Sequence, residues 1–178
     1  MASPGQCLRD PATDARLRFL ETAASTEGRF IEVELDGPPA GRPVRSIVHN
    51  EQLELITVMA GELATIVAGR QAVARTGETV VVPAATPHTV RAQTGQGVKL
   101  RVRFTPALRS DQLLERMYGG GDRYRPPPFV PAALRSLIES RGYRQEIHYF
   151  WPGKITRAAA ALLLPVAFAV GVCRRLPR

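Results

Sequence analysis

The stretch Gly77–Val90, "GETVVVPAATPHTV", joins an apolar run, a turn and a histidine within one short segment. The residues Thr79–Pro83 are apolar on both faces of an extended chain, as expected of a strand inside a double-layered or closed β structure. Two prolines then bracket a turn, and His88 opens the next apolar run. The stretch therefore predicts two strands connected by a tight turn that brings His88 in from the second strand.

Short apolar runs of the same kind extend in both directions, from Arg16 to Pro106. Glycine- and proline-rich turn signals separate them, and several, such as "FIEVELD" at residues 30–36, alternate apolar and charged residues. Strands at this spacing, without a helical period, predict a mainly β sandwich or barrel. The runs are "RLRFL", "RFIEVEL", "VRSIVH", "LELITVMA", "ELATIVA", "QAVAR", "ETVVVP", "HTVRAQ" and "VKLRVRF".

The pattern changes after Pro106. The segment "SDQLLERMYGG" begins with a helix-capping signal and ends on glycines, which predicts a helix of about two turns. A breaker-rich linker, "GGGDRYRPPP", leads to "VPAALRSLIESRGY", which has helical spacing, and to a last segment that is apolar all round. We therefore expect a flexible N-terminus over residues 1–15, a β-barrel over 16–108 and a helical C-terminal extension over 109–178.

Composition is that of a globular protein, with 44% hydrophobic and 22% charged residues in 178. Two cysteines near opposite ends of the chain form no disulfide framework, which favours a reducing, cytoplasmic compartment. The net charge of +8 comes mostly from residues 109–178, where 12 basic residues face 5 acidic ones. The arginines are scattered and aromatics make up only 6%, so we expect no nucleic-acid partner.

Two spaced motifs in the β region resemble those of the cupin superfamily of small jelly-roll barrels. The second motif follows the family's G-x5-P-x-G-x2-H-x3-N, with alanine in place of its second glycine and of its asparagine. The first motif usually reads H-x-H, then three or four residues, then Glu, and a few residues later Gly. The residues at the motif positions are Gly77, Pro83, Ala85, His88 and Ala92 for the second motif, and Ile47, His49, Glu54 and Gly61 for the first.

Ile47 stands where the family has its first histidine. Because side chains two apart on a strand share a face, Ile47 and His49 are expected to point the same way. The match is tight over residues 42–106, and the flanking segments look like those of small bacterial monocupins. The resemblance implies a cupin-type jelly-roll β-barrel with C-terminal α-helices, and cupins of this kind often form homodimers.

In cupins the motif residues hold a divalent metal such as iron, manganese, nickel or zinc. The resemblance implies His49, Glu54 and His88 as metal ligands here, a reduced 2-His-1-Glu set that is formally the facial triad of non-haem iron enzymes. The loss of an imidazole at Ile47 is expected to lower metal affinity, so a site without metal stays open. His49 as a core histidine and Glu54 as an outward charge are the structural alternatives.

The expected function is to bind or convert a small organic molecule in the barrel cavity. With a metal, the chemistry would be that of an oxygenase or an isomerase. Without one, Glu54 and His88 are candidate catalytic residues, as general base and acid, or the domain is a ligand-binding or sensing module. His148, in "EIHYFWPG", lies outside both motifs and is expected to pack the tail against the barrel.

The uncharged run Ala158–Cys173 has basic residues on both sides. As a helix it would span about 24 Å at ~1.5 Å per residue, and Pro165 interrupts it, so it is short for a membrane span. We expect it to pack on the barrel or in a dimer interface. The alternative is an accessory protein that residues 154–178 anchor at an anionic membrane surface.

Overall fold

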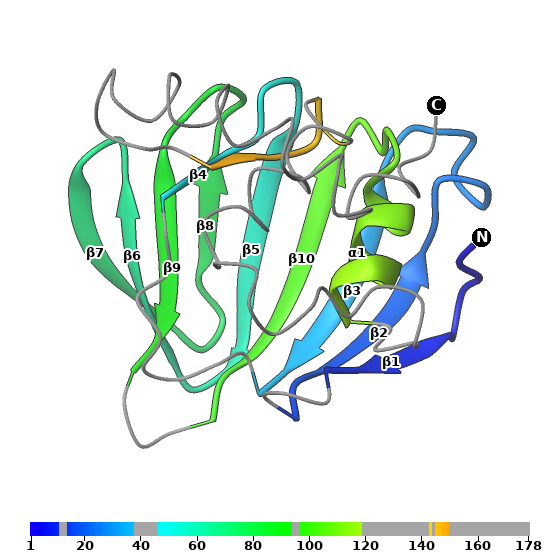
Figure 1. Cartoon of the computed structure of the whole chain (residues 1–178). Coiled ribbons are helices and arrows are strands. Elements are labelled where there is room, and N and C mark those ends of the chain that lie inside the picture. The colour runs from blue at the N-terminus through cyan, green and yellow to red at the C-terminus, as the bar shows by residue number, and fades with distance from the viewer. Residues whose placement is uncertain (11–13, 38–45, 94–96, 119–142, 144, 150–178) are drawn as a thin grey trace, which may run out of the picture.

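The computed structural model describes residues 1–10, 14–37, 46–93, 97–118, 143 and 145–149, whose strands form two antiparallel sheets (Figure 1). One sheet has six strands, in the spatial order β1 (Cys7–Arg9), β2 (Arg16–Glu21), β3 (Ile31–Asp36), β10 (Lys99–Thr105), β5 (Leu53–Ala60) and β8 (Thr79–Val82). The other has five, in the order β11 (His148–Tyr149), β4 (Ile47–Val48), β9 (His88–Ala92), β6 (Glu62–Val67) and β7 (Arg70–Arg75).

Each of the nine predicted runs forms one strand, β2 to β10, and the mainly β, jelly-roll fold class is confirmed. Strands distant in the sequence become neighbours, since β10 lies between β3 and β5 and β9 lies between β4 and β6. The strands that the structure describes form two separate sheets and do not close into one hydrogen-bonded barrel. Two edges, β7 and β8, therefore end the sheets on the same side of the sandwich (Figure 1).

Alternation along the strands decides which face of each sheet is buried. On β10, Leu100, Val102 and Phe104 are buried in the core, while Arg101 and Arg103 point outward. The two arginines pair across the sheet with Glu34 and Glu32, at 3.2 and 2.9 Å. Burial of the apolar face is the main favourable term for a sheet of this kind.

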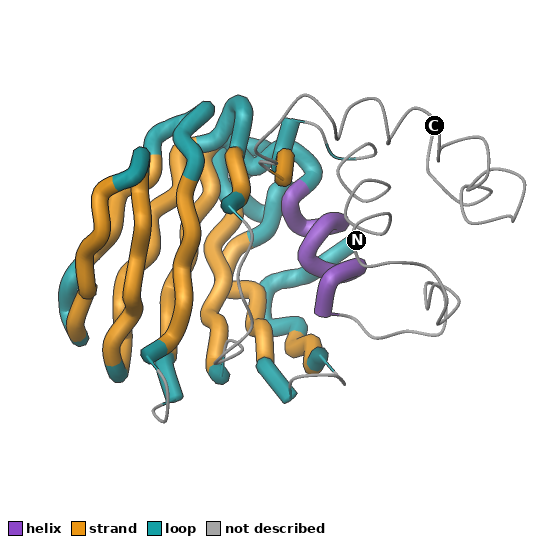
Figure 2. The backbone as a smooth tube through the Cα atoms, turned by 60° about the vertical axis from the view of Figure 1, so that its left-hand side comes forward, coloured by secondary structure: helices purple, strands orange, loops and turns teal. Residues whose placement is uncertain are grey.

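Helix α1 (Ser110–Tyr118) forms where the capping signal predicts it, and its Leu113 and Leu114 are buried. In the tube view the helix lies beside the strands, at one end of the sandwich (Figure 2). Buried Gln52 connects the β4–β5 turn to the helix start, since its Nε2 donates to the Ser110 Oγ at 2.8 Å and to the Pro106 carbonyl at 2.7 Å. The elements next to β4 are thereby held together.

The division of the chain into three parts stays a prediction, and strand β1 lies in the part expected to be a flexible N-terminus. The predicted linker, the second predicted helix and the apolar run Ala158–Cys173 lie outside the described residues. Within the described residues, none of the helices has the length and apolar character that a membrane span needs.

Candidate metal centre

Three predicted site residues from three different elements meet between the sheets. His49 directly follows β4, Glu54 lies on β5, and His88 is the first residue of β9. All three are buried, with exposed fractions of 5%, 6% and 1%. One ligating atom from each lies within 4.8 Å of the others, so the predicted convergence is confirmed.

The facing atoms are the Nε2 atoms of the two imidazoles and one carboxylate oxygen. Glu54 Oε2 lies 2.9 Å from His88 Nε2 and 3.4 Å from His49 Nε2. Although these contacts are short, none of the three atoms makes a hydrogen bond to the residues that the structure describes. Two ligands at ~2.1 Å from one ion and at right angles to each other lie about 3 Å apart, so the spacing fits a shared cation.

The other ring nitrogens of both histidines are occupied. His49 Nδ1 donates to the Glu146 carbonyl at 2.5 Å, and His88 Nδ1 donates to the Thr86 carbonyl at 3.1 Å. Because a carbonyl oxygen only accepts, each Nδ1 carries a proton, and in the neutral imidazole the lone pair is then on Nε2. Both lone pairs face the Glu54 carboxylate. This arrangement is stable only if a proton or a metal cation lies between the nitrogen atoms and the carboxylate oxygen.

The electrostatics of the site follow from this contact. Burial by itself raises the pKa of Glu54, but the contacts with His49 and His88 outweigh it and lower the pKa to about 2. Burial likewise lowers the pKa of His49, but the contacts with Glu54 and the Glu146 carbonyl outweigh it and raise that pKa. The carboxylate is thus ionised at neutral pH, as a metal ligand must be.

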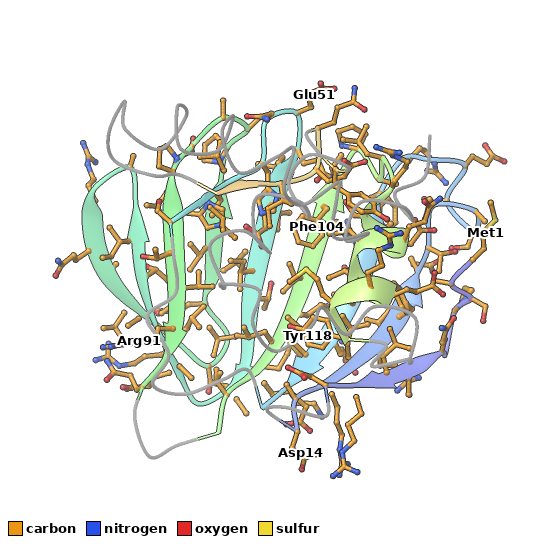
Figure 3. The ribbon with its side chains drawn as sticks, in the orientation of Figure 1. Met1, Asp14, Glu51, Arg91, Phe104 and Tyr118 are labelled. Atoms are coloured by element: carbon orange, nitrogen blue, oxygen red, sulfur yellow. The ribbon has the colours of Figure 1, made fainter. Side chains whose placement is uncertain are left out.

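The wall on the side of the absent first histidine is apolar. Ile47 pairs directly with His88 across the sheet and packs against Leu113, Tyr143 and Ile147. Phe104, labelled in Figure 3, places its ring edge-on to His49, with 5.1 Å between ring centroids. Ile47 therefore belongs to a packed cluster that leaves no donor at this position.

Glu146 is a residue of the candidate site that the motifs did not identify. Its carbonyl orients His49, and its fully buried Oε1 accepts from the Arg109 backbone N at 3.0 Å and Nε at 3.3 Å. Strand β11, two residues later, pairs with β4 and fixes this segment beside the site. The only signal in the sequence was the aromatic-rich "EIHYFW", expected to pack on the barrel. The side chain of His148 lies outside the described residues.

The departures from the second motif also have a structural reading. Ala85, in the place of a glycine, has a φ of 57°, and its N–H donates to the His49 carbonyl at 2.7 Å. The turn of one motif is thus bonded to the histidine of the other. Gly61 of the first motif has a φ of 85°, and a Cβ there would lie 2.5 Å from the Gly97 carbonyl oxygen. Only glycine fits at that position.

Comparisons with known proteins identify one family model and several similar solved structures. A family model described as "Cupin domain" matches residues 27–102. An RmlC-like cupin from Shewanella frigidimarina is similar at 17% identity and a TM-score of 0.48, over 58% of this chain and 86% of that one. KdgF from a Halomonas species is similar at 14% identity and a TM-score of 0.47, over 60% and 94% of the two chains. Curated proteins compared by sequence give no match.

Proposed function

The chain belongs to the cupin superfamily through its domain at residues 27–102, and on that premise we propose that it is a metal-dependent protein that binds or converts a small organic molecule. The observation that carries the proposal is the group of His49, Glu54 and His88, whose three facing atoms are buried without hydrogen-bond partners among the described residues. Buried polar atoms without partners are costly unless a ligand satisfies them.

The donor set fits a divalent first-row ion. Two imidazoles and a carboxylate suit iron, manganese, nickel or zinc, and three protein ligands leave positions open for a substrate. A bound ion would supply Lewis-acid polarisation of a substrate oxygen or, for a redox-active metal, electron transfer. Iron would favour oxygenase chemistry, whereas zinc would favour isomerase-like chemistry.

The protein's own residues hold and shield this site. The Glu146 and Thr86 carbonyls fix the two ring orientations, and Glu54 supplies the negative charge. Phe104 and the cluster around Ile47 exclude water on one side.

A metal-free acid–base mechanism with Glu54 as base and His88 as acid is the second candidate. Glu54 lies 2.9 Å from His88, within reach of a proton transfer. A general base works best with a pKa near the working pH, however, and the pKa of Glu54 is about 2. This difference favours Glu54 as a ligand over Glu54 as a base.

Metal analysis of the purified full-length chain tests the proposal. After both aerobic and anaerobic preparation we expect about one divalent ion per chain, lost in His88→Ala and in Glu54→Gln. The matched control is His148→Ala, which removes the one histidine outside the motifs and should retain the metal. Chelation should lower the melting temperature of the wild type and leave that of His88→Ala unchanged.

The proposal is wrong if neither preparation contains metal and chelators do not change the melting temperature. Equal metal loss in His88→Ala and His148→Ala would also contradict it, because it would indicate binding outside the buried site.

A further inference from the structure

An open groove runs between β7 and β8, the two edge strands on this side of the described sandwich. It has a volume of about 890 Å³ and lies between the inner sides of β6 and β7 and strand β8. Its wall is mostly small and apolar, with Val67, Ala72, Ala74, Val80, Val81 and Pro83 among the lining residues. A groove of this size and character is suited to a small molecule with an apolar body.

The groove is adjacent to the metal centre in both sheets. In the five-stranded sheet Val67, which lines the groove, pairs directly with His88. In the facing sheet Val82 pairs with Glu54, and Val80, two residues earlier on the same face of β8, lines the groove. Directly opposed residues on antiparallel strands share a face, as do residues two apart on one strand, so the groove lining shares the inner face with His88 and Glu54, two of the three candidate ligands.

Arg70 puts a positive charge at this end of the groove. It lines the groove and pairs directly with Val67, so Arg70, Val67 and His88 form one row on the inner face of three adjacent strands. The two-residue turn between β6 and β7, with Ala68 and Gly69 at φ values of 50° and 79°, fixes that pairing. Arg70 is therefore on the inner face by register.

Three other arginines of the two sheets have acidic partners. Arg75, on the outer face of β7, pairs with Glu62 at 3.2 Å, and Arg101 and Arg103 pair with glutamates on β3. The guanidinium of Arg70 has no ion pair or hydrogen bond to the part of the chain that the structure describes. At the far end of the groove, Glu78 already accepts from the Arg75 N–H at 2.7 Å. The site end of the groove is thus the end with a free cationic donor.

We propose that the groove binds small carboxylic acids with an apolar body, and that Arg70 is the residue that selects the carboxylate. A guanidinium offers two parallel N–H donors to a carboxylate, while Val67, Ala72 and Val80 contact the apolar body. The carbons next to the carboxylate are then the ones nearest to His88. What happens to the bound acid rests on the proposed function, but its binding does not.

The test is calorimetric titration of the metal-free and the zinc-loaded full-length protein with matched pairs of ligands. The panel is hexanoate, decanoate, benzoate and 3-phenylpropionate, each paired with the alcohol of the same carbon skeleton. At least one acid is expected to bind about fivefold more tightly than its alcohol. The expected factor is small because a solvent-exposed ion pair contributes little to the binding free energy. Arg70→Gln should remove this preference and leave the affinity for the alcohol and for zinc unchanged.

Two further variants locate the effect. Arg75→Gln removes a charge from the same strand but the opposite face, and should keep the preference. Ala72→Phe should weaken acid and alcohol alike by filling the groove. The inference is overturned if no acid is preferred over its alcohol, or if Arg70→Gln and Arg75→Gln act equally. A preference that depends on Arg70, in a protein that is purified without metal and takes up no zinc, would support the groove and refute the metal proposal. Stoichiometric metal without any preference would do the reverse.

Discussion

The site lies between two sides of the sandwich that differ in what covers them. Next to β4, helix α1 and the segment around Glu146 pack against the sheet, and the cluster of Leu113, Tyr143 and Ile147 seals the interior. Next to β7 and β8 the sheet edges have no partner strand among the described residues, and the groove reaches the row that contains His88. We call these the covered side and the open side.

The two sides differ in what they do for the site: the covered side orients a candidate ligand, and the open side gives access to it. His49, on the covered side, is oriented by a carbonyl whose own residue is held by Arg109. His88 is a direct neighbour of Val67, which lines the open side. Rigid support on one side and access on the other are both needed to hold a ligand set in place while a small molecule exchanges.

Acidification of the metal-free protein should have the largest effect, since Glu54 contacts both histidines. The folded pKa of Glu54 is about 2 against 4.5 for an unperturbed glutamate, so this stabilisation is present above pH 4.5 and is lost as pH falls towards 2. The loss is on the order of 3 kcal/mol. The pKa of His49 is raised, so its contribution is present below 6.5 and is lost as pH rises through the folded value.

Urea unfolding from pH 2 to 8 measures this profile. Glu54→Gln should flatten both limbs. An equally steep acid limb in Glu54→Gln would assign the acid sensitivity to other carboxylates.

Removal of the Glu146 side chain should damage the covered side alone. Glu146→Ala leaves the Arg109 N–H without its buried acceptor, and we expect a loss of about 2 kcal/mol in the free energy of unfolding. The Glu146 carbonyl that orients His49 belongs to a segment that this side chain anchors to Arg109. Loss of the anchor should loosen the His49 ring and lower zinc affinity about tenfold. Calorimetry of zinc and of the carboxylate panel separates the two sides, because the acid preference should persist. Glu146→Gln, which retains the shape, should be the milder change.

Ile47→His tests whether an apolar side chain on the covered side occupies the position of a metal ligand. The imidazole returns a donor opposite His88 and should raise zinc affinity about tenfold. The same change puts a polar ring against Leu113, Tyr143 and Ile147, so the metal-free variant should lose about 1–2 kcal/mol of stability. Unfolding with and without zinc measures both. If stability falls but zinc affinity does not rise, position 47 does not face the centre.

The smallest effect is expected at the turn that connects the two motifs. Ala85 holds a left-handed conformation at a φ of 57°, which glycine adopts without steric cost. Ala85→Gly should therefore stabilise the protein by about 0.5–1 kcal/mol after the entropic cost of glycine, with zinc affinity unchanged. Thermal unfolding measures it, and a destabilised variant would show that the backbone strain is absent.

Much of the fold could be read from local patterns. Period-2 alternation in "FIEVELD" and "VKLRVRF" predicted β3 and β10 because one face of each strand is buried. The spacing of His49, Glu54 and His88 predicted their convergence, since the family's motif residues share one cavity. The sequence also showed that Ile47 stands in place of the first histidine of the motif. It did not show which side chains pack against Ile47.

The chain itself therefore determined the strands, the three donor atoms and the missing fourth, because these depend on residue type and on short spacings. Tertiary structure alone decided that Glu146 orients His49 across 97 residues and that Arg70, Val67 and His88 form one row. Both depend on which strands become neighbours, and β-pairing between distant segments leaves no local trace in the residues that meet.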